Sequence, residues 1–181
     1  MQKKNSSVFE TTRLIGRCWN PDHAKAALEI YSDPEVTQYI PSMHSNDVEE
    51  MRQTINEIIE RDRSLPQGMG SFPVFLKTTG TMIGTALIKP LPDANGELTD
   101  QVEIGWHLAR RQWGRGYATE YGKKLIEIGF CEFHRDELHA LVDPPNEKSK
   151  KVALRLGMER IGQTTQYYLG QLADHFVIRK S

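Results

Sequence analysis

Two glycines and two arginines in one short loop are the residues of this 181-residue chain whose types and spacing best suit chemistry. The loop reads Arg111-Gln112-Trp113-Gly114-Arg115-Gly116 and lies between residues 101–108, which have strand character, and residues 118–130, which have helical character. A helix that begins after such a loop presents unpaired backbone N–H groups and the positive end of its dipole, which together bind phosphate-like anions. Glycine lets the backbone turn sharply and approach a ligand, and arginine adds positive charge. The loop therefore predicts a site for a phosphorylated ligand, and an ordinary turn is the equally weighted alternative.

This loop differs from two common phosphate-binding motifs. No Gly-Lys-Ser/Thr follows Gly116, as a P-loop requires, and the third glycine of a dinucleotide fingerprint would fall on Thr119. A nucleotide-binding protein or a phosphate-binding regulator is therefore disfavoured.

The same residues and their neighbours resemble the acetyl-CoA-binding motif of the GNAT superfamily of N-acetyltransferases. The motif consists of Arg111-x-x-Gly114-x-Gly116, preceded by Glu103-Ile104-Gly105-Trp106 and followed by Tyr117-Ala118-Thr119-Glu120. From about Thr12 to Ile178 the chain is similar to the RimJ/RimL-like branch, whose first strand resembles Thr12-Arg13-Leu14-Ile15 and whose second cofactor-side helix resembles Asn146-x-x-Ser149. The resemblance implies an α/β GNAT fold, with a mixed, mostly antiparallel central sheet of about seven strands flanked by about four helices.

The resemblance also implies acetyl-CoA as co-substrate and no metal ion. In the family the loop binds the diphosphate, and the pantetheine arm lies where the preceding strand splays from its neighbour. The residues that the resemblance assigns to acetyl-CoA are Trp106, His107, Leu108, Arg111, Gln112, Trp113, Gly114, Arg115, Gly116, Tyr117, Ala118, Thr119, Asn146 and Ser149. Asn146 also suits a helix cap.

Glu103 is the candidate general base for the reaction that the resemblance implies. In that reaction a neutral primary amine attacks the thioester directly, a tetrahedral intermediate forms, and CoA thiolate leaves. Alternate residues of a strand share one face, so His107 is a second titratable candidate beside Glu103. A structural salt bridge explains Glu103 equally well, and a packed or surface histidine is the more frequent reason for a residue such as His107.

The general acid is where the sequence departs from the superfamily pattern. Many members carry a tyrosine seven residues after the asparagine that Asn146 matches, and Ala153 stands at that position here. Tyr167 and Tyr168 lie downstream, and Tyr168 is the candidate catalytic substitute. Two tyrosines in a strand more often serve packing, and the thiolate can also leave without an acid.

We expect an N-acetyltransferase whose acceptor is an amine of a small molecule or of a peptide N-terminus. The alternative is an acyl-CoA-binding module of the same fold with little or no turnover, which the missing family tyrosine keeps open. An α-amine costs about 1.4 kcal/mol to deprotonate at pH 7, whereas a lysine amine costs about 4.6 kcal/mol. An α-amine acceptor therefore needs less help from a general base than a lysine does.

Hydrophobic periodicity and turn signals predict the elements that must position these residues. Strands are expected at residues 13–18, 72–77, 81–88, 100–108, 137–142, 158–168 and 175–178. Helices are expected to begin at Asn20-Pro21, at Ser45-Asn46, near residue 118 and at Asn146, with the first ending at Asp33-Pro34 and the last at Gly157. Residues 36–43 are expected to be irregular, and residues 89–99 to form a hairpin loop.

Composition limits the classes of protein that the chain fits. A net charge of −1 provides no basic field for nucleic acid, and no apolar run approaches the ~20 residues that span a bilayer. The start lacks the apolar core of a secretory leader, and Cys18 and Cys131 lack metal-site spacing, so we expect buried free thiols and a cytoplasmic protein. We expect one domain over residues 1–181, flexible over residues 1–8, that acts as a monomer or homodimer.

Overall fold

The computed structural model describes residues 7–180. The strands are β1 Ser7–Glu10, β2 Leu14–Arg17, β3 Gly70–Leu76, β4 Met82–Pro92, β5 Leu98–Leu108, β6 Glu137–Val142, β7 Glu159–Thr164 and β8 Ala173–Arg179. The α-helices are α1 Ala24–Tyr31, α2 Pro34–Thr37, α3 Val48–Arg63, α4 Tyr117–Cys131 and α5 Glu147–Arg155. The hydrogen-bonded strand order is β1-β2-β3-β4-β5-β6-β8-β7, with β5 and β6 parallel. The predicted α/β class with a mixed, mostly antiparallel sheet is confirmed, and the described residues form eight strands and five α-helices rather than about seven and four.

The chain divides into two compact units. Of the described residues, unit 1 contains 7–86 and 106–121, and unit 2 contains 87–105 and 122–180. Strands β4 and β5 and helix α4 each run from one unit into the other. The loop that resembles a cofactor site therefore belongs to unit 1, and Glu103 belongs to unit 2.

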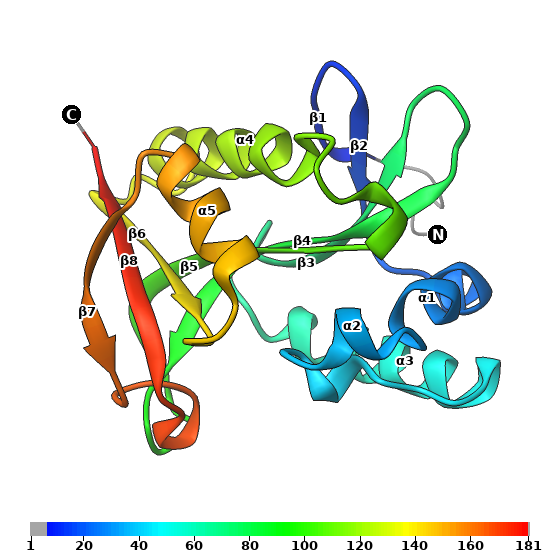
Figure 1. Ribbon diagram of the computed structural model, residues 1–181, viewed down its shortest axis with the longest axis horizontal. Helices are drawn as coiled ribbons and strands as arrows, with labels where there is room; N and C mark the ends of the chain where they lie inside the picture. The colour runs from blue at the N-terminus through cyan, green and yellow to red at the C-terminus, as the bar shows by residue number, and fades with distance from the viewer. Residues whose placement is uncertain (1–6, 181) are drawn as a thin grey trace. The chain divides into compact units, whose positions relative to one another are not determined.

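The core of unit 1 forms around α1 and α3 (Figure 1). The predicted helix start is confirmed, because the Asn20 side chain accepts a hydrogen bond from the Asp22 N–H at 2.9 Å and His23 Nδ1 accepts one from the Asn20 N–H at 3.2 Å. One 3-10 turn, Pro21–His23, then leads into α1. The predicted apolar stripe of α3 is buried in the same core and includes Met51, Ile55 and Ile58.

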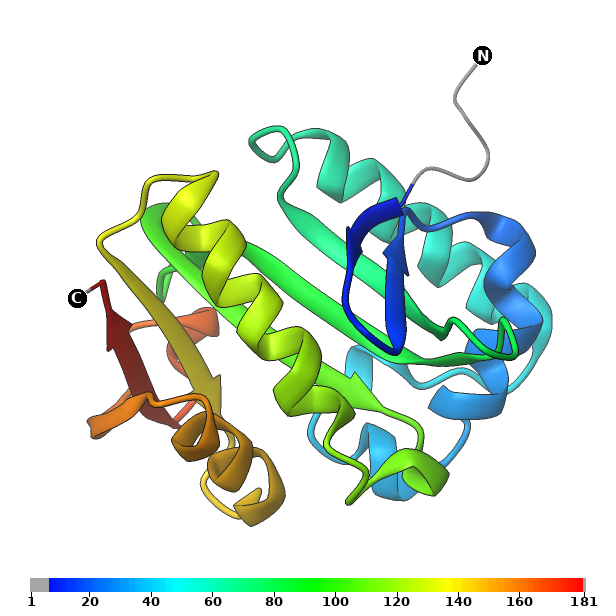
Figure 2. The ribbon, with the colours of Figure 1, turned by 90° about the horizontal axis from the view of Figure 1, so that it is seen from above.

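Strand β1 was not expected from the sequence. Residues 7 and 8 were expected to be flexible, but Ser7–Glu10 pairs antiparallel with β2 as a hairpin (Figure 2). The Phe9 ring lies on Gly16, where an added Cβ would come within 2.2 Å of it. A strand of four residues that packs one aromatic ring on a glycine is too short a pattern to be predicted from the sequence. Residues 1–6 of the expected flexible segment lie outside the described residues.

Two further expectations in unit 1 are corrected by capping side chains. Residues 36–43 are not wholly irregular, because α2 extends to Thr37 and a 3-10 turn covers Pro41–Met43. Helix α3 is capped by Asp47, whose Oδ1 accepts hydrogen bonds from the N–H groups of Glu49 and Glu50, and not by Ser45 or Asn46. Several adjacent residues were suitable caps, and only the backbone conformation selects one.

In unit 2, β8 lies between β6 and β7, and α5 lies beside these strands (Figure 1). Strand β6 has the predicted bounds and pairs with β8 from Glu137↔Arg179 to Val142↔Asp174. The predicted cap of α5 is confirmed, because Asn146 Oδ1 accepts a hydrogen bond from the Ser149 N–H at 3.1 Å. Gly157 follows the helix with a φ of 85°, the left-handed conformation that commonly ends a helix.

The hairpin predicted at residues 89–99 is present, but its loop is shorter than expected, because β4 extends to Pro92 and β5 begins at Leu98. The connection is confined to a short turn in which Asp93 N–H donates to the Glu97 carbonyl at 2.8 Å. The Asp93 carboxylate accepts hydrogen bonds from the N–H groups of Asn95 and Glu97 and thereby closes the turn. Prolines near the end of β4 concealed how far the strands of this hairpin extend.

Strand β7 ends at Thr164, so Tyr167 and Tyr168 do not lie in a strand as expected. Tyr168 and Leu169 adopt positive φ values of 48° and 58°, which break the extended backbone. Such left-handed backbone is unusual for residues with bulky side chains, and the sequence carries no local sign of it.

Both cysteine side chains are exposed, so the expectation of buried thiols was wrong. Cys18 directly follows the last residue of β2, and Cys131 is the last residue of α4. Each therefore lies at the end of a strand or helix, where its side chain is outside the core.

Gly84 of β4 approaches the end of β5 so closely that an added Cβ would lie 2.0 Å from the His107 carbonyl oxygen. We predict that Gly84→Ala lowers the free energy of unfolding by about 2–4 kcal/mol, because the two strands must separate. Gly80→Ala is the matched control: a Cβ there meets nothing within 4 Å and, at a φ of +66°, adds only left-handed strain of about 1 kcal/mol. Urea denaturation followed by circular dichroism measures both, and equal losses would contradict the close-approach explanation.

Candidate active site

The loop before α4 holds consecutive backbone N–H groups that find no backbone acceptor in the described part of the chain. Its first part, Arg110–Gln112, is a 3-10 turn in which the N–H groups of Gln112 and Trp113 donate to the carbonyls of Ala109 and Arg110 at 2.8 and 3.1 Å. Gly114 and Gly116 then adopt φ values of 75° and 79°. The next N–H with a recorded acceptor is that of Glu120, 3.0 Å from the Gly116 carbonyl. Within residues 7–180, the N–H groups of residues 114–119 therefore have no backbone acceptor, whereas those of Gln112 and Trp113 are used by the 3-10 turn.

The predicted side chains around this loop are held by neighbours in unit 1. Arg111 Nη2 lies 3.7 Å from a carboxylate oxygen of Glu29 on α1, and its side chain is half exposed. Trp113 Nε1 donates to the Leu108 carbonyl at 2.9 Å, so the indole covers the end of β5. The Gln112 side chain is buried. Arg115 is exposed and follows the first glycine.

His107 is packed within unit 1. Its ring meets the Tyr31 ring edge-on, with centroids 6.3 Å apart. Its carbonyl accepts a hydrogen bond from the Tyr121 hydroxyl at 3.3 Å. Burial raises the pKa of both tyrosines well above the ordinary value, so both stay neutral. This surrounding supports the packing explanation for the His107 side chain over a catalytic one.

Glu103 and Tyr168, two of the three predicted catalytic residues, lie together in unit 2. The Glu103 side chain is buried, and its Oε1 accepts a hydrogen bond from the Tyr168 hydroxyl. Lys89 Nζ lies 3.4 Å from the same oxygen and 5.3 Å from the centroid of the Tyr168 ring. The site thus combines a carboxylate, a phenol and an ammonium group in one cluster.

Lys89 is the member of this cluster that the sequence analysis missed. It was assigned to a loop, whereas it lies on β4 of the hairpin whose other strand, β5, carries Glu103. The Thr99 hydroxyl donates to the Leu91 carbonyl at 2.9 Å, which fixes how the two strands face each other. The Asp93-Ala94-Asn95-Gly96 turn signal, read as a tight turn, would have extended both strands and placed Lys89 near Glu103.

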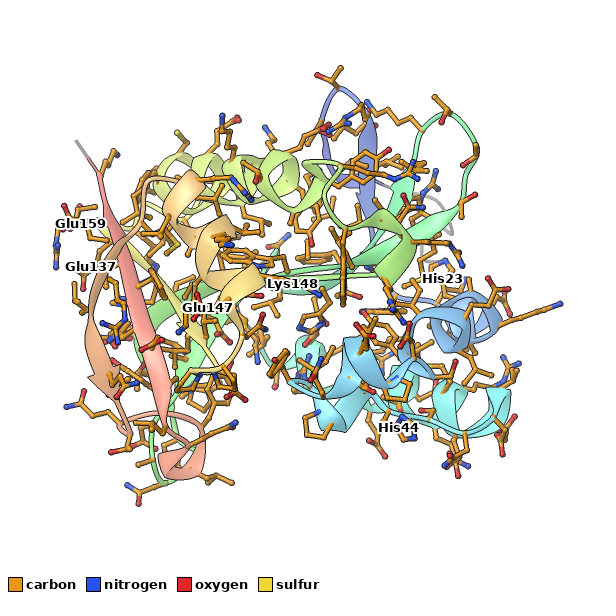
Figure 3. All side chains as sticks on the ribbon, viewed as in Figure 1. His23, His44, Glu137, Glu147, Lys148 and Glu159 are labelled. Carbon is orange, nitrogen blue, oxygen red and sulfur yellow. The ribbon has the colours of Figure 1, made fainter. Side chains whose placement is uncertain are left out.

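Asn146 and Ser149 lie at the start of α5, near Glu147 and Lys148 (Figure 3). Asn146 caps the helix through the Ser149 N–H, so its structural explanation holds whether or not it contacts a ligand. Lys150 Nζ lies 2.7 Å from Oδ2 of the buried Asp174, which also binds Arg160 and so ties α5 to the sheet. Ala153, at the position of the family tyrosine, is buried.

A buried pair of histidines, His139 and His175, lies in unit 2 on the same face of the sheet as the Glu103 side chain. Glu103 pairs with His139 in the β5–β6 register, and His139 Nδ1 lies 2.9 Å from His175 Nε2 on β8. The Tyr167 ring packs edge-on against His175, and its hydroxyl donates to Gln101 on β5. Two adjacent buried imidazoles cannot both be charged at low cost, so at least one stays neutral at neutral pH.

Comparison with protein families matches residues 13–159 to the acetyltransferase (GNAT) domain. The chain is also 33% identical over 169 residues to a protein from Bacillus licheniformis named uncharacterized N-acetyltransferase p20, and the match covers 92% of each chain. The family match includes the loop before α4, Glu103 and the start of α5.

Solved structures of similar fold include two acetyltransferases with different acceptors. One, from Salmonella typhimurium, modifies the N-terminal serine of ribosomal protein L7/L12; it has a TM-score of 0.74 and 16% identity, and the match covers 97% of this chain and 100% of that one. The other is the aminoglycoside acetyltransferase AAC(6')-Ib in complex with coenzyme A, with a TM-score of 0.72, 18% identity and coverage of 92% and 95%. At identities of 16% and 18%, the similarity to these two structures shows a shared fold only.

Among the described residues, no helix is both long enough and apolar enough to cross a membrane. In the same part of the chain, no three His, Cys, Asp or Glu side chains gather as a metal site.

The buried histidines of unit 2 predict a loss of stability in mild acid. Burial lowers the pKa of His139, and burial together with His139 lowers the pKa of His175, below the ordinary value of 6.5. The unfolded chain therefore binds protons near pH 6.5 while the folded chain does not, so stability is full above pH 6.5 and falls as the pH drops through the folded pKa values.

We predict that the melting temperature falls between pH 7.5 and 5 and that His139→Leu/His175→Leu flattens this dependence. His44→Gln is the matched control, because His44 is exposed on unit 1 (Figure 3). Calorimetry across this pH range makes the comparison. A double variant with the slope of the native protein would contradict the assignment.

Proposed function

Because the chain belongs to the acetyltransferase (GNAT) domain family, we propose that it is an N-acetyltransferase that moves an acetyl group from acetyl-CoA to a primary amine. The observation that carries the proposal is the run of N–H groups at residues 114–119 that have no backbone acceptor among residues 7–180; this run lies within the matched part of the chain. Consecutive amides at a helix N-terminus are the donors that a diphosphate requires.

The loop fits the diphosphate of acetyl-CoA on steric grounds as well. An added Cβ at Gly114 would meet nothing within 4 Å, so the backbone there is open to a ligand. Arg111 and Arg115 supply positive charge, and Asn146 and Ser149 are the proposed contacts to the pantetheine arm. Trp106, His107 and Leu108 are proposed to contact the arm through their backbone.

Glu103 is the proposed general base. Acetyl-CoA supplies an activated acetyl group, and the amine must be neutral to attack it. The Lys89 ammonium favours the ionised form of the buried Glu103 carboxylate, which is the form that accepts a proton. A role as general base would account for a carboxylate that is otherwise costly to bury.

Tyr168 is the proposed general acid, in place of the tyrosine that Ala153 replaces. Glu103 takes the proton that the amine loses, and Tyr168 donates its hydroxyl proton to the CoA sulfur. The hydrogen bond between them then returns the proton from Glu103 to the Tyr168 oxygen, so both residues regain their starting states.

An α-amine is the acceptor class that this site serves at lowest cost. About 10% of an α-amine is already neutral at pH 7, whereas a lysine amine is almost wholly protonated. Acetyltransferases of similar fold act on an N-terminal serine or on aminoglycosides, so peptide N-termini and small amines are both to be tested.

The second candidate function is an acyl-CoA-binding module with little turnover. The buried Ala153 favours it, because the family acid is missing from α5. Thiol release from acetyl-CoA, measured with N-terminal peptides, polyamines and aminoglycosides, distinguishes the two. Binding of acetyl-CoA without release across the panel would favour the module, and absence of binding would refute both.

We predict that Gly114→Ala weakens acetyl-CoA binding about tenfold, because the methyl group occupies the open side of the loop. Gly80→Ala is the control for backbone strain, since Gly80 and Gly114 have φ values of 66° and 75° and both lie in open space. Isothermal titration calorimetry measures the dissociation constants. Equal effects of the two variants would argue against a diphosphate site at this loop.

We predict that Glu103→Gln lowers kcat about 10²- to 10⁴-fold, as expected on loss of a general base, with less change in the KM for acetyl-CoA. The residual rate should rise with pH as more of the amine becomes neutral. Glu97→Gln, in the exposed turn of the same hairpin, controls for the loss of one negative charge. A Glu103→Gln enzyme with the native kcat and pH profile would leave Glu103 only its salt-bridge role.

A further inference from the structure

We propose that Arg13, on the β1–β2 connection, is a positioning residue that keeps the loop before α4 open to the diphosphate; the inference rests on the proposed function. Its guanidinium donates from Nε to a Glu120 carboxylate oxygen at 2.6 Å and from Nη1 and Nη2 to the Arg115 carbonyl at 3.2 Å each. It also lies 4.4 Å from the centroid of the Tyr117 ring. All of these groups belong to unit 1, and Arg13 contacts both the loop and the first turn of α4.

The first task of Arg13 is to fix the direction of the loop amides. The two Nη groups hold the Arg115 carbonyl, which belongs to the same peptide group as the Gly116 N–H. A carbonyl held toward Arg13 directs that N–H away from Arg13, because the two point to opposite sides of a planar peptide. An added Cβ at Gly116 would lie 3.7 Å from Nη2, an ordinary contact, so glycine is favoured at this position by its φ of +79° and not by the guanidinium.

Arg13 also neutralises Glu120, an acidic residue that lies beside the proposed anion site. Glu120 lies in the first turn of α4, where its charge competes with a bound diphosphate for the positive end of the helix dipole. Its carboxylate accepts hydrogen bonds from the Thr11 hydroxyl at 2.6 Å and from the Arg13 N–H at 2.9 Å, besides the ion pair with Arg13. Burial alone would raise the pKa of Glu120, but these partners outweigh it and lower the pKa, so the acid is ionised and needs the Arg13 charge.

A purely structural ion pair is the alternative, and it predicts a different pattern of variants. If the pair only fastens the hairpin to α4, removing either partner should weaken acetyl-CoA binding equally. If Arg13 offsets the Glu120 charge, removing Glu120 alone should not weaken binding, because the repelling charge disappears while Arg13 stays on the Arg115 carbonyl. Gln at position 120 keeps an oxygen that accepts the hydrogen bonds from Thr11 and Arg13.

The test compares Arg13→Ala, Glu120→Gln and the double variant in the full chain by titration with acetyl-CoA. Arg13→Ala is expected to weaken binding about tenfold, Glu120→Gln to leave it within about twofold or tighten it, and the double variant to recover about half of the loss on a logarithmic scale. In turnover assays the Arg13→Ala change should appear in the KM for acetyl-CoA, with kcat within about twofold. Lys77→Ala is the matched control, because Lys77 forms a similar pair with Glu10 of β1, 2.9 Å apart, outside the loop.

A measurement without ligand separates this inference from the proposed function. Amide hydrogen exchange of Glu120, whose N–H donates to the Gly116 carbonyl at 3.0 Å, should be faster in Arg13→Ala than in the native protein or in Lys77→Ala, because this hydrogen bond opens more often once the neighbouring Arg115 carbonyl loses its two donors. Unchanged exchange, unchanged binding, or equal weakening by Arg13→Ala and Glu120→Gln would each overturn the inference. If the native protein does not bind acetyl-CoA, the proposed function and the role of Arg13 in it both fail, whatever the exchange result.

Discussion

An α-helix cannot satisfy the N–H groups of its own first turn, and the proposed diphosphate site depends on what the fold does with those of α4. The preceding 3-10 turn uses the N–H groups of Gln112 and Trp113, and Gly114 then turns the chain into left-handed backbone. From that point to residue 119 the donors have no backbone acceptor among the described residues. A side chain that capped them would give a more ordinary helix and remove the anion site.

The features that could be predicted from the sequence depend on local chemistry. Asn20 before Pro21 and Asn146 before α5 are caps whose partners lie two or three residues away, so short patterns identify them. Gly157 ends a helix for an equally local reason. The GNAT family and its mostly antiparallel α/β fold were predicted from three separated motifs and are confirmed by the family match and the strand order.

The features that could not be predicted depend on contacts between distant residues or on unusual backbone. The cluster of Lys89, Glu103 and Tyr168 requires a hairpin that continues through prolines, together with a tyrosine in left-handed conformation. Tyr168 was nominated for the chemical need of an acid, while its expected position in a strand was wrong. The structure brings the Tyr168 hydroxyl to the Glu103 carboxylate, a contact between residues far apart in the sequence that strand propensity does not indicate.

The two explanations of Glu103, salt bridge and general base, are not exclusive once its burial is considered. A carboxylate with 5% exposure cannot stay ionised without a counter-charge, and Lys89 supplies one at 3.4 Å. A general base must likewise be ionised before the amine arrives, so the contact that makes burial tolerable also prepares the base. Under the proposed function, Lys89 further disfavours the approach of an amine that is still protonated. This discrimination against protonated amines matters least for an α-amine, because about 10% of it is already neutral at pH 7.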